Sequence, residues 1–100
     1  MVLAYGISEL INDLSNLIPD VETELNKRVK GVPGNGNEEQ LRFILEELKN
    51  IRTMAEQNEL PPKSHRWTAF SRYVVDEWDP SYLLGKQLCK LADNYKSEIS

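Results

Sequence analysis

The stretch Asn37–Gln57 decides the fold, and it reads NEEQLRFILEELKNIRTMAEQ. Its first residue, Asn37, is a typical helix N-cap, and Gln40 stands three residues later as the partner of a capping box. Apolar residues then recur at helical spacing on one face: Leu41, Ile44, Leu45, Leu48, Ile51 and Ala55. The stretch therefore predicts an amphipathic helix over residues 38–57.

The same helix carries a second apolar line on its opposite side. Phe43 and Met54 lie there, with Glu47 and Asn50 between them at helical spacing. Two interpretations stay open. Either the helix is central and contacts neighbours on two sides, or Phe43 and Met54 form an exposed line for a partner or a second subunit.

The region before this helix also has a helical pattern. Its apolar residues fall on one stripe and predict a helix over residues 2–18: Leu3, Ile7, Leu10, Ile11, Leu14, Leu17 and Ile18. Pro19 either kinks this helix or ends it and opens a short extra helix over about 19–30. The segment 31–37, GVPGNGN, is a loop because it holds three glycines and a proline.

Two further helices are expected in the second half of the chain. The double proline in residues 58–63 ends the second helix, and Ser64 is placed to cap a third over 64–78. Asp79 then caps a fourth over 80–98, with Pro80 at its first position. The sequence therefore predicts an all-α fold, an antiparallel bundle of four principal helices in a single domain spanning 1–100.

The third helix contains the aromatic stretch HRWTAFSRYVVDEWD at residues 65–79. A helical projection from residue 64 onward places one apolar face against the core: Trp67, Phe70, Val74, Val75 and Trp78. It leaves Arg66 and Tyr73 on a flank and His65 and Arg72 on the far side. Tyr and Arg are enriched at interface hot spots, so the flank and the far side are candidate contact residues.

The charge of the chain is uneven. The net charge is −4, and the first basic residue, Lys27, follows five acids: Glu9, Asp13, Asp20, Glu22 and Glu24. Acidic skew disfavours nucleic acid, since binding to phosphates needs Lys and Arg. It favours a basic protein partner through complementary fields, although a solvated face gives the same pattern.

The sequence contains no pattern typical of an enzyme or of a cofactor site. The glycine loop lacks the lysine of a phosphate-binding motif, and Glu38 and Glu39 occupy the following helix start. His65 and Cys89 are single and far apart, so neither a zinc site nor a nucleophile with its base is expected. The N-terminus resembles neither a signal peptide nor a membrane span. The expectation is a cytoplasmic, non-enzymatic protein without metal or cofactor.

A resemblance adds a sharper hypothesis. In the segments LPPKS at 60–64 and SRYVVDEWD at 71–79, and in Leu84-Gly85, the chain resembles small bacterial immunity proteins of polymorphic toxin systems. The resemblance covers about residues 60–88 and implies a stoichiometric inhibitor that occludes a toxin domain. It transfers no binding residue.

We therefore expect a protein–protein interaction domain, in its sharpest form an immunity or antitoxin-like protein that binds a basic toxin domain. The alternatives are a homodimeric regulatory or adaptor protein, which would pair through Phe43 and Met54, and a nucleic-acid-associated regulator. The residues expected to contact a partner are Glu9, Asp13, Glu22, Glu24, Phe43, Met54, Arg66, Arg72 and Tyr73.

Overall fold

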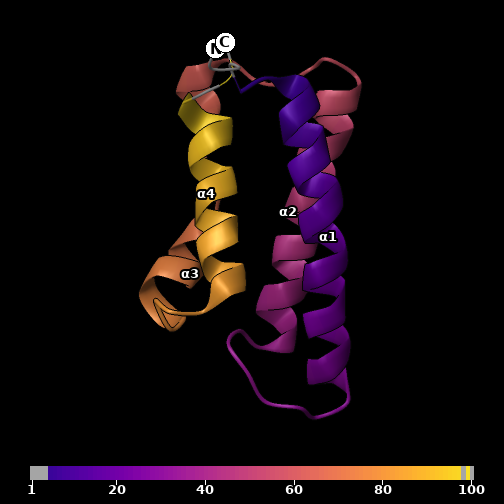
Figure 1. Ribbon diagram of the computed structural model, residues 1–100, viewed down its shortest axis with the longest axis vertical. Coiled ribbons are helices and arrows are strands. Elements are labelled where there is room, and N and C mark those ends of the chain that lie inside the picture. The colour runs from indigo at the N-terminus through magenta and orange to yellow at the C-terminus, as the bar shows by residue number, and fades with distance from the viewer. Residues whose placement is uncertain (1–4, 98, 100) are drawn as a thin grey trace.

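The computed structural model describes residues 5–97 and 99 and contains four α-helices (Figure 1). They are α1 (Ile7–Val29), α2 (Glu38–Glu56), α3 (Phe70–Glu77) and α4 (Leu83–Ser97), with a short 3₁₀ turn at Lys63–His65. No strand occurs within the described residues. The predicted all-α four-helix bundle is confirmed.

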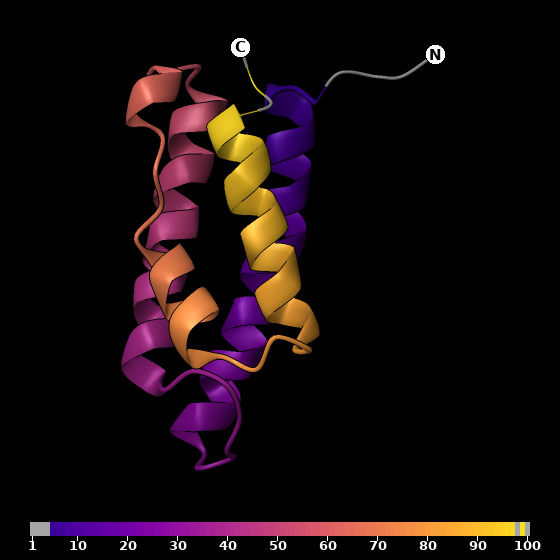
Figure 2. The ribbon, with the colours of Figure 1, turned by 90° about the vertical axis from the view of Figure 1, so that its left-hand side faces the viewer.

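The helices alternate in direction. α1 and α2 form a long antiparallel hairpin, and α4 runs antiparallel to α1 (Figure 1). The third pass combines an extended connection with the short helix α3, which returns along α2 (Figure 2). Because α3 is only eight residues long, the extended connection runs along the remaining length of the bundle.

The helix α1 continues through Pro19 to Val29, so of the two alternatives left open by the sequence, the separate short helix over 19–30 does not form. Pro19 itself is exposed, and Thr23 Oγ1 donates a hydrogen bond to its carbonyl at 2.9 Å. Ile18 and Val21 on either side of it are buried in the core. An interior proline costs about 3 kcal/mol, and burial of the continuous apolar face of α1 offsets that cost. Residues 2–4 of the predicted first helix lie outside the described residues.

The helix α2 matches its prediction closely. Asn37 Oδ1 accepts the Gln40 backbone N–H at 2.7 Å, and Gln40 Oε1 accepts the Asn37 N–H at 3.2 Å. The predicted capping box is therefore confirmed. Leu41, Ile44 and Leu48 on the main apolar face are fully buried against the other helices.

The third helix differs most from its prediction. It begins at Phe70 instead of residue 64, and Ser64 is an exposed residue of the 3₁₀ turn. Trp67 therefore precedes the helix and is 73 % exposed, so its assignment to the core is wrong. The chain leaves helical geometry at Arg66, whose backbone has φ −93° and ψ 85° and whose side chain is buried.

The last helix begins at Leu83, three residues later than predicted. Asp79 Oδ1 accepts hydrogen bonds from the Ser81 backbone N–H (2.9 Å) and hydroxyl (2.8 Å), which forms a tight turn around Pro80. The predicted apolar face is confirmed, because Leu84, Leu88, Leu91 and Tyr95 are all buried.

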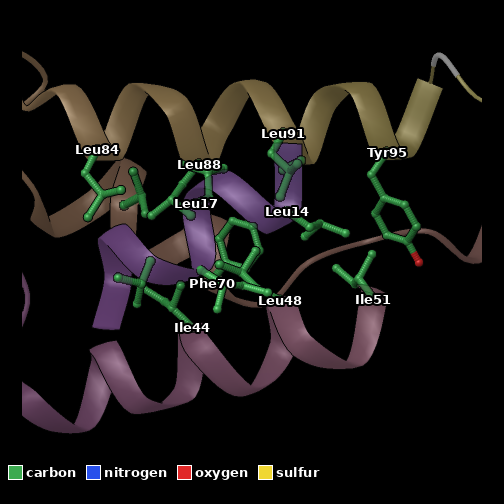
Figure 3. Close-up of a cluster of buried hydrophobic side chains, with 14 of the residues drawn as sticks. Leu14, Leu17, Ile44, Leu48, Ile51, Phe70, Leu84, Leu88, Leu91 and Tyr95 are labelled. Carbon is green, nitrogen blue, oxygen red and sulfur yellow. The ribbon is translucent and has the colours of Figure 1, made fainter. Parts of the chain in front are cut away.

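The core is centred on Phe70, which is fully buried. Its ring lies among leucine and isoleucine side chains from α1, α2 and α4 (Figure 3). A single aromatic residue of the shortest helix thus joins the other three helices.

Candidate functional site

Three carboxylates form a line along α1, on the side that borders α4. We call Glu9, Asp13 and Asp20 the acidic flank; they are spaced at i, i+4 and i+11 and therefore fall on one side of the helix. Tyr5 Oη donates to Asp13 at 2.7 Å, and Glu9 accepts the Gly6 backbone N–H at 3.0 Å. Asp20 is exposed. Burial, together with the hydrogen bond to Asp13, raises the pKa of Tyr5.

Two open hollows adjoin the acidic flank. One has a volume of about 210 Å³ between α1 and α4, where Asp13 and Asp20 stand beside the buried side chains of Leu17 and Leu91. Lys90 of α4 also borders it. The other, of about 400 Å³, adjoins Glu9 and Asp13 near the start of α1. The flank therefore combines negative charge with concave surface.

Two of the predicted acidic contact residues do not join this flank. Glu24 is half-buried and bonds to the Tyr82 hydroxyl, and its Oε2 lies 3.6 Å from Lys27 Nζ and 3.7 Å from Arg28 Nη1. Burial, reinforced by the Glu24 carboxylate, raises the pKa of Tyr82 to about 12. Glu22 is exposed but lies two residues after Asp20, on nearly the opposite side of the helix.

The second line of α2 is the contact surface for α3 and the segment before it. Phe43 packs edge-on against Tyr73, with ring centroids 5.7 Å apart. Glu47 accepts the backbone N–H groups of Ala69 (3.1 Å) and Phe70 (2.9 Å). The interpretation of α2 as a central helix is therefore confirmed for this line.

The two apolar residues of that line differ in exposure. Met54 is partly buried and packs against the core, whereas Phe43 remains 42 % exposed beside Tyr73. Arg72, predicted on the far side of the third helix, is exposed. Phe43, Tyr73 and Arg72 thus remain accessible, and Met54 is mostly covered.

The prediction that Arg66 lies on an exposed flank is wrong. The residue is 5 % exposed, and its guanidinium donates to the carbonyls of Pro61 (2.7 Å), Ile99 (2.6 Å) and Tyr95 (3.5 Å). It also lies over the Tyr95 ring, 5.9 Å from the centroid. Arg66 fixes the end of α4 against the connection before α3, so it is not available to a partner.

A groove between α3 and α4 was not predicted from the sequence. We call it the α3–α4 groove; it has a volume of about 580 Å³. Its lining residues are Val74, Val75, Trp78, Asp79, Pro80, Gly85, Lys86, Cys89, Lys90 and Asp93. The sequence placed Val75 in the core, but it is 69 % exposed at this groove.

Gly85 and Cys89 shape the groove. A Cβ on Gly85 would lie 3.3 Å from Val74 Cγ1 and 3.4 Å from Trp78 Cε3, so this glycine allows α3 and α4 to approach closely. Burial, with Asp93 nearby, raises the pKa of the Cys89 thiol. The neutral thiol therefore adds to the apolar lining and is a poor nucleophile.

The glycine loop is a structural connection, as its sequence predicted. Arg28 enters it and donates from Nε to the Gly36 carbonyl (2.9 Å) and from Nη2 to the Asn35 carbonyl (2.8 Å). The Asn35 side chain in turn accepts the Asp79 backbone N–H at 2.8 Å. The glycine loop, which connects α1 to α2, is therefore attached to the start of the turn before α4.

Neither metal-binding clusters nor membrane spans occur in the described part of the chain. Residues 5–97 and 99 contain no group of three or more His, Cys, Asp or Glu side chains that could hold a metal ion. None of the helices in the same residues has the length and apolar character needed to cross a bilayer. Models of known families, curated proteins and solved structures were all compared with the chain, and none matched.

Proposed function

We propose that this protein is a non-enzymatic binding module that docks a basic partner protein on the acidic flank of α1. The observation that carries the proposal is the alignment of Glu9, Asp13 and Asp20 beside two open hollows. The outer two positions, Glu9 and Asp20, are eleven residues apart, or about 16 Å along the helix, which is long enough to meet several basic side chains of one partner.

The flank suits recognition by both charge and shape. Its carboxylates produce a field that speeds encounter with a basic surface and depends on salt. The hollow beside Asp13 and Asp20 has an apolar floor at Leu17 and Leu91, which fits the aliphatic stem of an arginine or lysine below its charged end. Arginine pairs especially well with carboxylates because its donors can bind both oxygens.

The sharpest form of the proposal is an immunity-like protein that acts in the cytoplasm. A rigid bundle bound across the basic surface of a toxin domain would block access to that surface without any chemical step. The faint resemblance in residues 60–88 supports this form. The homodimeric and nucleic-acid-associated alternatives are less favoured in this proposal, since Met54 is partly buried and the Arg66 side chain is buried.

Affinity capture with a matched variant tests the proposal. The wild-type protein and a triple variant, Glu9→Gln, Asp13→Asn and Asp20→Asn, are immobilised and exposed to extract from the source cells at two salt concentrations. A basic protein should be captured by the wild type at low salt and lost both at high salt and with the triple variant. Equal capture by the two forms would refute the proposal.

A further inference from the structure

The α3–α4 groove has the features of a small-molecule site. Its volume of about 580 Å³ lies in the range typical of ligand pockets. Val74, Trp78 and Gly85 form buried parts of its lining, and the highly exposed Val75 and the exposed Pro80 extend the apolar surface. An apolar concavity of this size favours a ligand with an apolar body.

Two lysines on the rim make the groove favour a ligand with a negatively charged group. Lys86 and Lys90 are one helical turn apart on α4, and both are exposed. Among the described residues, neither ammonium has a carboxylate oxygen within 4.0 Å. Two cations this close can share a single anionic group between them.

The carboxylates of the groove lie outside this pair of lysines. The Asp79 carboxylate is oriented toward its own turn, because both hydrogen bonds that it accepts come from Ser81. Asp93 follows Lys90 by three residues, at the end of the groove away from Pro80. An anion between Lys86 and Lys90 is therefore favoured, although Asp93 in the groove, and Asp13 and Asp20 at the neighbouring hollow that Lys90 borders, weaken the attraction.

From this arrangement we propose that the α3–α4 groove binds a free amphiphile, with its apolar body on Val74, Val75 and Trp78 and one anionic group at Lys86 and Lys90. A medium-chain carboxylate has this chemistry. The groove and the acidic flank lie on different sides of α4, and Lys90 borders both the groove and the hollow beside Asp13 and Asp20.

The probes are octanoate and its neutral counterpart 1-octanol, which differ at the head group only. Trp67 is exposed and outside the groove, so Trp67→Phe leaves Trp78 as the sole indole reporter with little effect on the fold. Octanoate should change Trp78 fluorescence saturably and shift the amide resonances of groove residues. 1-Octanol should bind about tenfold more weakly, as expected when two exposed charge contacts are lost.

Charge variants make the test specific. The double variant Lys86→Gln, Lys90→Gln should weaken octanoate binding about tenfold and leave 1-octanol binding unchanged. Lys96→Gln, on the same helix but outside the groove, should change neither. Asp93→Asn should strengthen octanoate binding, because it removes a repulsive charge.

Any of several results would overturn the proposal. These are equal binding of octanoate and 1-octanol, unchanged octanoate binding in the double lysine variant, or resonance shifts that fall outside the groove. Absence of saturable octanoate binding would also overturn it. Thermal unfolding of each variant shows whether the fold is retained, and Val75→Asp, at an exposed position, provides a further block of the groove.

Discussion

Glu47 of α2 caps α3 by accepting the backbone N–H of Phe70 at 2.9 Å, twenty-three residues later in the chain. The second carboxylate oxygen accepts the Ala69 N–H at 3.1 Å. Ala69, at the N-cap position, makes no side-chain capping bond of its own. The helix that carries the central aromatic residue of the core therefore depends on a cap from another helix.

We predict that Glu47→Ala destabilises the protein by about 1–2 kcal/mol, since capping N–H groups would lose their acceptor. Glu46→Ala, one position earlier and exposed, is the matched control and should change stability by no more than about 0.5 kcal/mol. Urea unfolding measures both. Equal effects of the two substitutions would show that the cap is energetically unimportant.

Arg66 should be a stability residue despite its position in a stretch that looked like a recognition surface. Arg66→Ala would leave buried carbonyls without donors, and we expect a loss of about 2–4 kcal/mol. Arg66→Lys should recover only part of this, because an ammonium cannot reproduce the fixed fork of the guanidinium. The exposed Arg72→Ala serves as the control, with an effect near zero by urea unfolding. A fully stable Arg66→Ala protein would contradict the structure.

Substitutions at two glycines of the α1–α2 loop distinguish the cost of backbone strain from the cost of a clash with a neighbouring side chain. Gly31 and Gly36 both have positive φ (86° and 81°). A Cβ on Gly36 would lie 2.6 Å from Trp78 Cζ2, whereas a Cβ on Gly31 would meet nothing within 4 Å. Gly31→Ala should therefore cost about 1 kcal/mol for the backbone alone, and Gly36→Ala clearly more. Thermal unfolding should rank them in this order, and the reverse order would refute the contact with Trp78.

Stability should fall at high pH through Tyr82. Its pKa is raised by burial and by Glu24 from 10.0 to about 12, so the folded state holds its proton more tightly than the unfolded state. The resulting stabilisation is fully present below pH 10 and is lost as the pH rises toward about 12. Tyr82→Phe should reduce the slope of unfolding free energy against pH in this window. An unchanged slope would contradict the role of Tyr82.

Much of the helical framework was predictable because it follows from local spacing. The apolar faces of α1, α2 and α4 and the capping box at Asn37 were all read correctly from residues a few positions apart. Pro19 was undecidable, since its outcome depends on how much surface α1 buries against its neighbours. The balance between proline strain and packing is a property of the assembled bundle.

The errors around residues 64–69 have a non-local cause. A projection from residue 64 treats the segment as helix, and so places Trp67 inside and Arg66 outside. The structure reverses both, because Arg66 finds carbonyl partners at Tyr95 and Ile99, about thirty residues away. The α3–α4 groove was likewise invisible, as it depends on how two separate helices approach at Gly85.

Docking on the acidic flank requires the negative charges to lie at particular positions of α1. Two substitutions distinguish the position of a charge from the net charge. Asp20→Asn and Glu22→Gln each remove one negative charge from an exposed residue of α1, but only Asp20 lies on the flank. The measurement is the dissociation constant of each variant for the basic partner identified by capture, determined by calorimetry. We predict that Asp20→Asn weakens binding by about tenfold, as for a charged contact, and that Glu22→Gln has little effect. Equal weakening by both would mean that net charge alone attracts the partner and would contradict docking on the acidic flank.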